Sequence, residues 1–139
     1  MGSEMCIRDR TGTAGWIAGL ISSATESVPS EWQPRVLLAL IYFITIFLTE
    51  ISSNAATAII MTPISIAVAQ QMGFDPRAFV FAVAFAASAS FITPVGYQTN
   101  LMVYGPGGYK FSDYIRVGFP LAFIFWIMAI FILPILWPI

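Results

Sequence analysis

The chain has 139 residues, of which 58% are hydrophobic and only 9% are charged, and its formal net charge is −1. Soluble domains carry about 25% charged residues, so this composition excludes an ordinary soluble domain and indicates an integral membrane protein. The net charge gives no electrostatic basis for nucleic-acid binding. With no histidine and one cysteine, His/Cys metal clusters and an internal disulfide are also excluded.

Residues 1–10, MGSEMCIRDR, are polar and lack the apolar core of a signal peptide. The favoured interpretation is a non-native scar, because CIRDR resembles translated sequencing-adapter sequence; the alternative is a short, disordered native cytoplasmic arm. If the segment is a scar, Met1 is not the biological start and the chain is the C-terminal piece of a longer protein. Residues 11–34 are expected to hold the end of a truncated helix and an interfacial loop.

Residues 35–75 are predicted to form a re-entrant helical hairpin. As a helix, residues 36–49 reach about 21 Å, which is less than the roughly 30 Å of the hydrocarbon core. A polar tip follows at residues 49–54, and residues 55–72 return with a kink at Pro63. The alternative is one long kinked helix over residues 36–72, which would place Glu50 in the middle of the bilayer.

Residues 76–109 are predicted to form a broken transmembrane helix. Asp75 is placed to cap it, residues 78–93 are rich in alanine and serine, and Pro94 and Gly96 interrupt it. Residues 110–139 should contain a charged interfacial loop and a last transmembrane helix, because residues 117–139 carry no charge. The expected fold class is therefore an all-α integral membrane protein.

The two polar interruptions have the chemistry of an ion site. The first interruption, at residues 49–54, supplies hydroxyl, amide and free carbonyl oxygens, which are the hard ligands that sodium prefers. In the second interruption, at residues 94–100, Gly96 lets the backbone approach the site closely, because it has no Cβ atom. Helix N-termini near Ala55 and Asn100 would direct their positive dipole ends at an anion. The alternative is that these polar groups serve only as interhelical hydrogen-bond partners. Glu50 is interpreted as structural, and Tyr97 either lines a substrate cavity or is an interfacial tyrosine.

The segments LTEISSNAATAIIMTPI and PVGYQTNLMVYGPGGYKFSDYIRVG resemble the second half of divalent-anion:sodium symporters, the citrate-transporter-like domain of the ion transporter superfamily. The resemblance covers roughly residues 11–139. It implies two inverted repeats, each with a re-entrant hairpin and a broken helix, that work as a homodimer by an elevator-like motion. This chain would carry the hairpin, the broken helix and the last span of the second repeat, with the N-terminal repeat missing.

The resemblance also implies roles for individual residues, and Na+ is the implied coupling ion. Ser52 and Gly96 would contribute carbonyl oxygens, and Asn54 would touch both sodium and substrate. The implied sodium ligands are Thr49, Ser52, Asn54 and Gly96. The implied substrate-binding residues are Ser53, Asn54, Ala55, Tyr97 and Gln98. Ala55 stands where the family signature has threonine, and the sequence from Gly96 to Asn100 resembles members linked to sulfate more than dicarboxylate carriers.

The sequence thus predicts the C-terminal fragment of a sodium-coupled secondary active transporter for a divalent anion, with sulfate favoured over dicarboxylate, in a bacterial inner membrane. We expect no enzyme, because no nucleophile or paired-aspartate constellation lies at membrane depth. One alternative is a cation/proton antiporter of the same superfamily, which would need Glu50 as its titratable residue. Another is that the isolated fragment is inert and structural.

Overall fold

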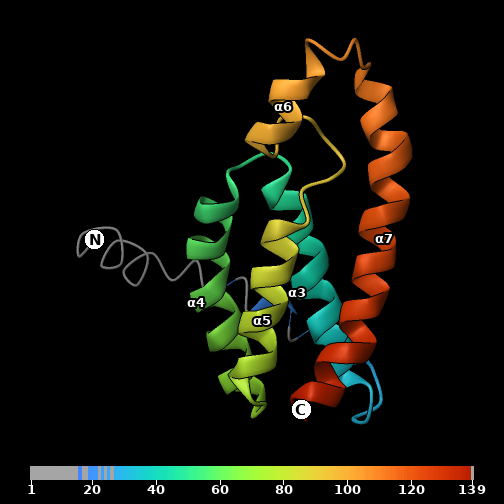
Figure 1. Ribbon diagram of the computed structural model, residues 1–139. Coiled ribbons are helices and arrows are strands. Elements are labelled where there is room, and N and C mark those ends of the chain that lie inside the picture. The colour runs from blue at the N-terminus through green and yellow to red at the C-terminus, as the bar shows by residue number, and fades with distance from the viewer. Residues whose placement is uncertain (1–15, 17–18, 22, 24, 26, 139) are drawn as a thin grey trace, which may run out of the picture.

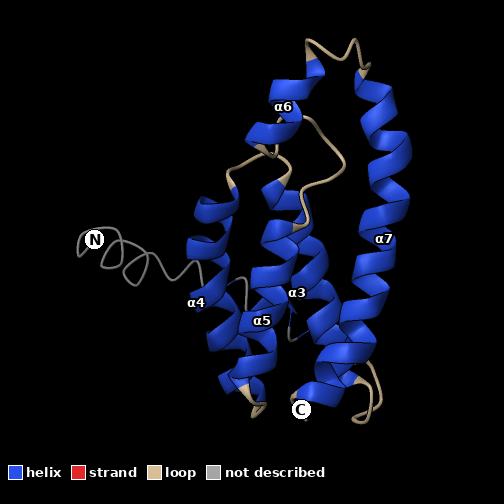
Figure 2. Ribbon diagram, viewed as in Figure 1, coloured by secondary structure: helices blue, strands red, loops and turns tan. Residues whose placement is uncertain are grey.

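The computed structural model describes residues 16, 19–21, 23, 25 and 27–138. Every secondary-structure element with defined ends in these ranges is a helix (Figures 1 and 2). The expected all-α class is confirmed for this part of the chain. Residues 1–10, interpreted above as a scar or an arm, lie outside the described residues. The bounded helices are α3 (Gln33–Thr49), α4 (Asn54–Met72), α5 (Pro76–Ser88), α6 (Gln98–Tyr104) and α7 (Phe111–Leu136).

The first three of these helices form an up-down-up arrangement (Figure 1). The chain reverses at residues 50–53, so α3 and α4 run antiparallel, and α5 packs against both of them. This reversal shows that a single kinked helix over residues 36–72 was the wrong alternative. Helix α4 continues through Pro63 and is closed by Gly73, whose left-handed φ of 76° suits glycine. Asp75 then caps α5 as predicted, accepting a hydrogen bond from Arg77 N at 2.9 Å.

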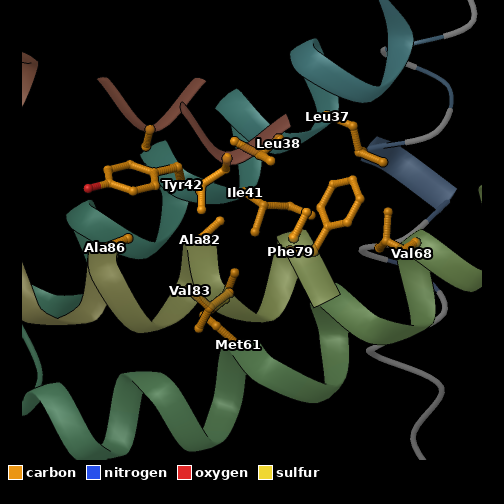
Figure 3. Packing of buried hydrophobic residues seen from close by; sticks show 14 of the residues in the cluster. Leu37, Leu38, Ile41, Tyr42, Met61, Val68, Phe79, Ala82, Val83 and Ala86 are labelled. Atoms are coloured by element: carbon orange, nitrogen blue, oxygen red, sulfur yellow. The ribbon is translucent and has the colours of Figure 1, made fainter. Parts of the chain in front are cut away.

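Small residues on one side of α5 allow the three helices to pack closely. Ala78, Ala82 and Ala86 are spaced by four residues and are completely buried, so they form a single stripe along the helix. Between apolar helices in a membrane, close van der Waals packing replaces the hydrophobic effect as the main stabilising term. Figure 3 shows this core in close view. Its labelled members are Leu37, Leu38, Ile41, Tyr42, Met61, Val68, Phe79, Ala82, Val83 and Ala86.

Helix α5 ends earlier than the sequence predicted. We expected helix through residue 93, whereas α5 stops at Ser88 and the chain is non-helical until α6 begins at Gln98. Pro94 prevents a helix from continuing through this region, because it has no N–H and its ring would clash with the carbonyl four residues earlier. The backbone N–H groups just before it are instead bound by a distant carboxylate.

Helix α7 begins earlier than expected, at Phe111 instead of residue 117. The Asp113 carboxylate accepts a hydrogen bond from Lys110 N at 2.8 Å, which caps the helix start. Asp113 and Arg116 therefore lie in the first turns of α7 and not in a loop. Farther along, Trp126 Nε1 donates to the carbonyl oxygen of Ala39 at 2.9 Å, which ties α7 to α3.

Two of the described helices, α4 and α7, are long and apolar enough to cross a membrane. An 18-residue stretch of α7 has a mean hydropathy of 2.6, and only 17% of that stretch is buried within the described structure. Most of this helix therefore presents large apolar side chains outward. Helix α3 has 17 residues, a length of about 25 Å. The re-entrant arrangement of α3 and α4 stays a prediction.

Candidate functional site

The tip of the α3–α4 hairpin carries the polar residues selected from the sequence. Thr49 is the last residue of α3 and is completely buried, whereas Asn54 is the first residue of α4 and is partly buried. Ser53 is the N-cap of α4, and its hydroxyl accepts a hydrogen bond from Ala56 N at 3.2 Å. Ser52 is partly buried between them. The hydrogen bond to Ala56 N fixes the start of α4 and therefore the position of Asn54 relative to the rest of the site.

Oxygen atoms from three parts of the chain meet at Asn54. The Thr49 hydroxyl donates to the carbonyl oxygen of Ala87, near the end of α5, at 2.8 Å. One terminal atom of the Asn54 amide lies 2.8 Å from Thr49 Oγ1, 3.1 Å from Ala87 O and 3.3 Å from Gly96 O. The structure therefore brings together three of the four predicted sodium ligands, Thr49, Asn54 and Gly96. Below we call these atoms the oxygen cluster: Thr49 Oγ1, Ala87 O and Gly96 O, with the Asn54 amide.

Gly96 is required by the space at this junction. A Cβ atom built at Gly96 would overlap Ser90 Oγ, and it would lie 3.0 Å from Thr49 O and 3.2 Å from Glu50 Oε2. Gly96 is buried, and its N–H donates to Thr93 Oγ1 at 3.2 Å. The missing side chain is what lets the backbone of the break approach the hairpin tip, as the sequence predicted.

Glu50 connects the hairpin tip to the break between α5 and α6. Its side chain is 7% exposed. Oε1 accepts from Ile92 N at 3.0 Å, and Oε2 accepts from Thr93 N at 2.7 Å. The Thr93 hydroxyl lies 2.7 Å from Oε2 and 3.1 Å from Glu50 O. These bonds satisfy backbone N–H groups that the broken helix leaves without intrahelical partners, which agrees with the structural role expected for Glu50.

Further polar contacts hold the second side of the break. Asn100 Nδ2 donates to Ser90 O at 3.1 Å, and the Tyr114 hydroxyl donates to Asn100 O at 3.1 Å. Ser90 Oγ is buried and has no hydrogen-bond partner among the described residues. Since a buried hydroxyl is normally paired, Ser90 is a functional candidate that the sequence analysis missed. The only sign of it in the sequence is a serine shortly before the interruption at Pro94 and Gly96, within the segment that is rich in alanine and serine.

The remaining predicted residues lie around the oxygen cluster without joining it. Ala55 is exposed in the first turn of α4, and Tyr97 and Gln98 are exposed at the start of α6. Among the described hydrogen bonds, none connects the side chains of Tyr97 or Gln98 to the cluster. Ser52 likewise makes no described contact with it. These assignments stay predictions.

Chemically, the oxygen cluster is suited to a hard monovalent cation. Its atoms are a hydroxyl, an amide and backbone carbonyls, and no carboxylate belongs to it. Among the described residues, no group of three or more Asp, Glu, His or Cys side chains could hold a metal ion. Neutral oxygens at the ends of broken helices are the ligands with which membrane transporters bind sodium. Sequence reasoning could not find the carbonyl of Ala87, because a backbone oxygen has no residue signature.

The long apolar helices and the polar junction of two helix breaks define an integral membrane protein with a buried polar site. The sequence matches the family model described as the sodium:sulfate symporter transmembrane region over residues 6–139. The chain belongs to this family. The family resemblance identified from the hairpin and break motifs is thereby confirmed.

Individual relatives agree with this assignment. An uncharacterized transporter from Synechocystis sp. is 49% identical over 84% of this chain and 18% of its own length. Sodium/sulfate cotransporter 1 of Chlamydomonas reinhardtii is 38% identical over 86% of this chain and 13% of its own length. The sodium-dependent dicarboxylate transporter SdcS of Staphylococcus saprophyticus is 31% identical over 78% of this chain and 20% of its own length. The chain thus spans about a fifth or less of these relatives.

Proposed function

We propose that this chain is part of a sodium-coupled secondary active transporter for a divalent anion. The observation that carries the proposal is the oxygen cluster, in which a hydroxyl, two backbone carbonyls and the Asn54 amide converge where the hairpin tip meets the broken helix. Family membership supports it, because relatives are named sodium/sulfate cotransporters and a sodium-dependent dicarboxylate transporter.

In this proposal, sodium is bound as a co-transported ion by Thr49 Oγ1, the side-chain oxygen of Asn54 and the carbonyl oxygen of Gly96. The buried Thr49 hydroxyl keeps a lone pair for the cation while its proton is donated to Ala87 O. Ser52 is included as a fourth ligand through its carbonyl on the basis of the family resemblance. Glu50 does not ligate sodium; it holds the break so that the Gly96 carbonyl stays at the tip.

The anion is assigned to the exposed side of the same junction. Ser53, Asn54 and Ala55 form the start of the 19-residue α4, where the first backbone N–H groups have no intrahelical partner and the helix dipole is positive. Tyr97 and Gln98, at the end of the break, would complete this side once the substrate is bound. Sulfate is favoured because Ala55 and the Gly96–Asn100 segment depart from the pattern of dicarboxylate carriers.

The remaining architecture also belongs to the proposal. The chain would supply the second inverted repeat of an elevator-type transporter, with α3 and α4 as a re-entrant hairpin, α5 and α6 as a broken helix and α7 as the last span. An N-terminal repeat of the same protein would complete the site, the full-length protein would be a homodimer, and its membrane would be the bacterial inner membrane. The large apolar surface that α7 leaves uncovered supports contact with lipid or with such partners.

The test is uptake by the full-length protein in proteoliposomes. An inward sodium gradient should drive accumulation of radiolabelled sulfate, and replacing sodium by potassium should abolish it. Succinate, added as a competitor, distinguishes the two anion classes, because only a dicarboxylate carrier would be inhibited strongly. Absence of sodium-driven uptake of either anion would contradict the proposal. The antiporter alternative instead requires proton movement against sodium, which a pH-sensitive dye inside the vesicles would report.

A further inference from the structure

At Gly118, the backbone of helix α7 lies directly against the break between α5 and α6. Gly118 is buried, and a Cβ atom built there would overlap the carbonyl group of Phe91 and lie 2.8 Å from the Cα atom of Ile92. Figure 1 shows the loop of this break bending toward α7. The atoms in the way belong to the backbone, which cannot turn aside as the end of a flexible side chain can. Only glycine fits at this contact without a shift of α7 or of the break.

Two further contacts join α7 to the same region. The rings of Phe91 and Phe125 have their centroids 5.6 Å apart, so α7 contacts both the backbone and the side chain of Phe91. On the other side of the break, the Tyr114 hydroxyl donates to the carbonyl oxygen of Asn100, in α6, at 3.1 Å. Tyr114 and Gly118 are four residues apart and therefore lie on one face of α7. Helix α7 thus bridges the break, with Gly118 on the α5 side and Tyr114 on the α6 side.

The contact at Gly118 acts on a segment that Glu50 also holds. Glu50 Oε1 accepts a hydrogen bond from Ile92 N at 3.0 Å, and the Cα atom of Ile92 lies against Gly118. The hairpin tip and α7 together therefore fix the chain just before Pro94. Gly96 follows closely, so a displacement of this segment also moves the carbonyl group that is proposed to bind sodium.

We propose that Gly118 and Tyr114 are positioning residues of the transport site, each for a different ion. The inference rests on the proposed function. Gly118 acts through the start of the break on the carbonyl group of Gly96, and thus on sodium. Tyr114 acts through α6 on Tyr97 and Gln98, which are assigned to the anion.

A methyl group added at Gly118 displaces the break more readily than α7. Helix α7 is anchored to α3 by the hydrogen bond from Trp126 Nε1 to Ala39 O at 2.9 Å, and its Ala129 and Leu133 are buried in the core. Residues 89–97 are non-helical, and an irregular segment adjusts its backbone at lower cost than a packed helix.

Uptake of radiolabelled sulfate by the full-length transporter in proteoliposomes tests the two roles separately. In Gly118→Ala, the sodium concentration for half-maximal uptake should rise by roughly tenfold, since overpacking costs about 1–3 kcal/mol. The half-saturating sulfate concentration, measured at saturating sodium, should change less. Gly105→Ala is the control, because nothing lies within 4 Å of a Cβ atom there.

Tyr114→Phe should give the opposite pattern, because it removes the hydrogen bond to Asn100 O and keeps the ring. We expect the half-saturating sulfate concentration to rise by roughly fivefold, with little change for sodium. Tyr109→Phe is the control, since Tyr109 is exposed and its hydroxyl makes no hydrogen bond with the described residues. This variant pair differs from the parent by single oxygen atoms, so it decides the matter even where Gly118→Ala is not recovered from the membrane.

Spin labels on cysteines introduced at Ala84, on α5, and Met102, on α6, report the geometry of the break without transport. Both residues are exposed in the described structure. Pulsed electron paramagnetic resonance on the full-length protein should show a shifted or broader distance distribution in Gly118→Ala and not in Gly105→Ala.

The outcomes separate this inference from the proposed function. If the parent protein shows sodium-driven sulfate uptake, and neither Gly118→Ala nor Tyr114→Phe changes the distances or the half-saturating concentrations, the positioning role is wrong and the proposed function stands. A lower maximal uptake with both half-saturating concentrations unchanged would show a merely structural role and would also overturn the inference. If the parent protein shows no sodium-driven uptake but Gly118→Ala shifts the distances, the proposed function is wrong while the control of the break by α7 stands.

Discussion

Glu50 Oε2 lies 2.7 Å from the backbone nitrogen of Thr93 and 2.7 Å from its hydroxyl, although the two residues are 43 positions apart. This carboxylate therefore holds the end of the hairpin against the break of the next helix. The proline that follows Thr93 cannot donate, and Glu50 supplies the acceptor that the interrupted helix lacks. The proposed sodium site depends on this contact because Gly96 comes three residues later.

The first prediction concerns Glu50→Gln. The glutamine amide would present its NH2 to the N–H groups of Ile92 or Thr93, leaving a buried donor unsatisfied at about 1–3 kcal/mol. We expect a lower thermal stability and an apparent sodium affinity reduced by roughly tenfold, since 1.4 kcal/mol corresponds to that factor. Sodium-dependent uptake and a thermal melt measured together would show it. Glu31→Gln, an exposed acid in the preceding loop, is the matched control.

The outcome also separates the two mechanisms considered for Glu50. A carboxylate that only positions the break gives an altered sodium affinity with an unchanged pH profile of uptake. A carboxylate that carries protons gives a pH-dependent flux that disappears in Glu50→Gln. Unchanged stability and sodium affinity would show that the contacts to Ile92 and Thr93 do not support the site.

The hairpin and the break could be predicted from the sequence because both depend on residue types that act locally. Ser53 and Asn54 are residues that cap helices, and Pro94 and Gly96 interrupt them. The end of α5 at Ser88 could not be predicted in the same way. It depends on Glu50, whose bond to Ile92 N spans 42 residues, and such a pairing has no local pattern.

Two other differences have similar causes. The early start of α7 depends on the side chain of Asp113, which turns back to accept a hydrogen bond from Lys110 N. The helix therefore includes charged residues, whereas a prediction from hydropathy alone places its start after them. The contribution of Ala87 to the oxygen cluster is a backbone carbonyl, so any residue type could supply it. Residues with polar side chains, such as Thr49, are easier to select from the sequence as candidates.

The second prediction concerns Gly96→Ala. The added methyl group would overlap Ser90 Oγ and press on Thr49 O and Glu50 Oε2, so the break must move away from the hairpin tip. We expect loss of most sodium-dependent uptake, with the protein still inserted in the membrane. Gly105→Ala is the control, because nothing lies within 4 Å of a Cβ there. Equal activity of both variants would mean that the backbone of Gly96 need not approach the tip.

The third prediction concerns Thr49→Ala. Removal of this hydroxyl takes one oxygen from the cluster and leaves Ala87 O without its donor at 2.8 Å. We expect the sodium concentration for half-maximal uptake to rise by roughly tenfold, a loss of about 1.4 kcal/mol, with a smaller effect on uptake at saturating sodium. Thr45→Ala is the matched control, since Thr45 is equally buried on α3 and donates only within its helix, to Ile41 O. Full sodium affinity in Thr49→Ala would make Thr49 an ordinary helix hydroxyl.

The fourth prediction concerns the topology of the hairpin. Ser30, before α3, and Gln71, in the last turn of α4, are both exposed and lie at the open end of the antiparallel pair. Cysteines introduced at these two positions should react with a membrane-impermeant thiol reagent from the same side. A cysteine at Gly105, beyond α6, should react from the other side. Labelling of Ser30 and Gln71 from opposite sides would contradict the hairpin.

The last prediction concerns Asn54→Asp, which replaces the amide by a carboxylate whose two oxygens can only accept hydrogen bonds. Toward the oxygen cluster the carboxylate still offers a sodium ligand, and its negative charge strengthens that interaction. The same change removes an N–H and places a charge beside the proposed anion, where like-charge repulsion is poorly screened. We therefore expect sodium binding to persist and anion uptake to be lost, whereas Asn54→Ala should lose both. Gln70→Glu, the same amide-to-carboxylate change at an exposed position near the far end of α4, should leave uptake unchanged. Substantial anion uptake by Asn54→Asp would place Asn54 away from the substrate and contradict a site shared by the two ions.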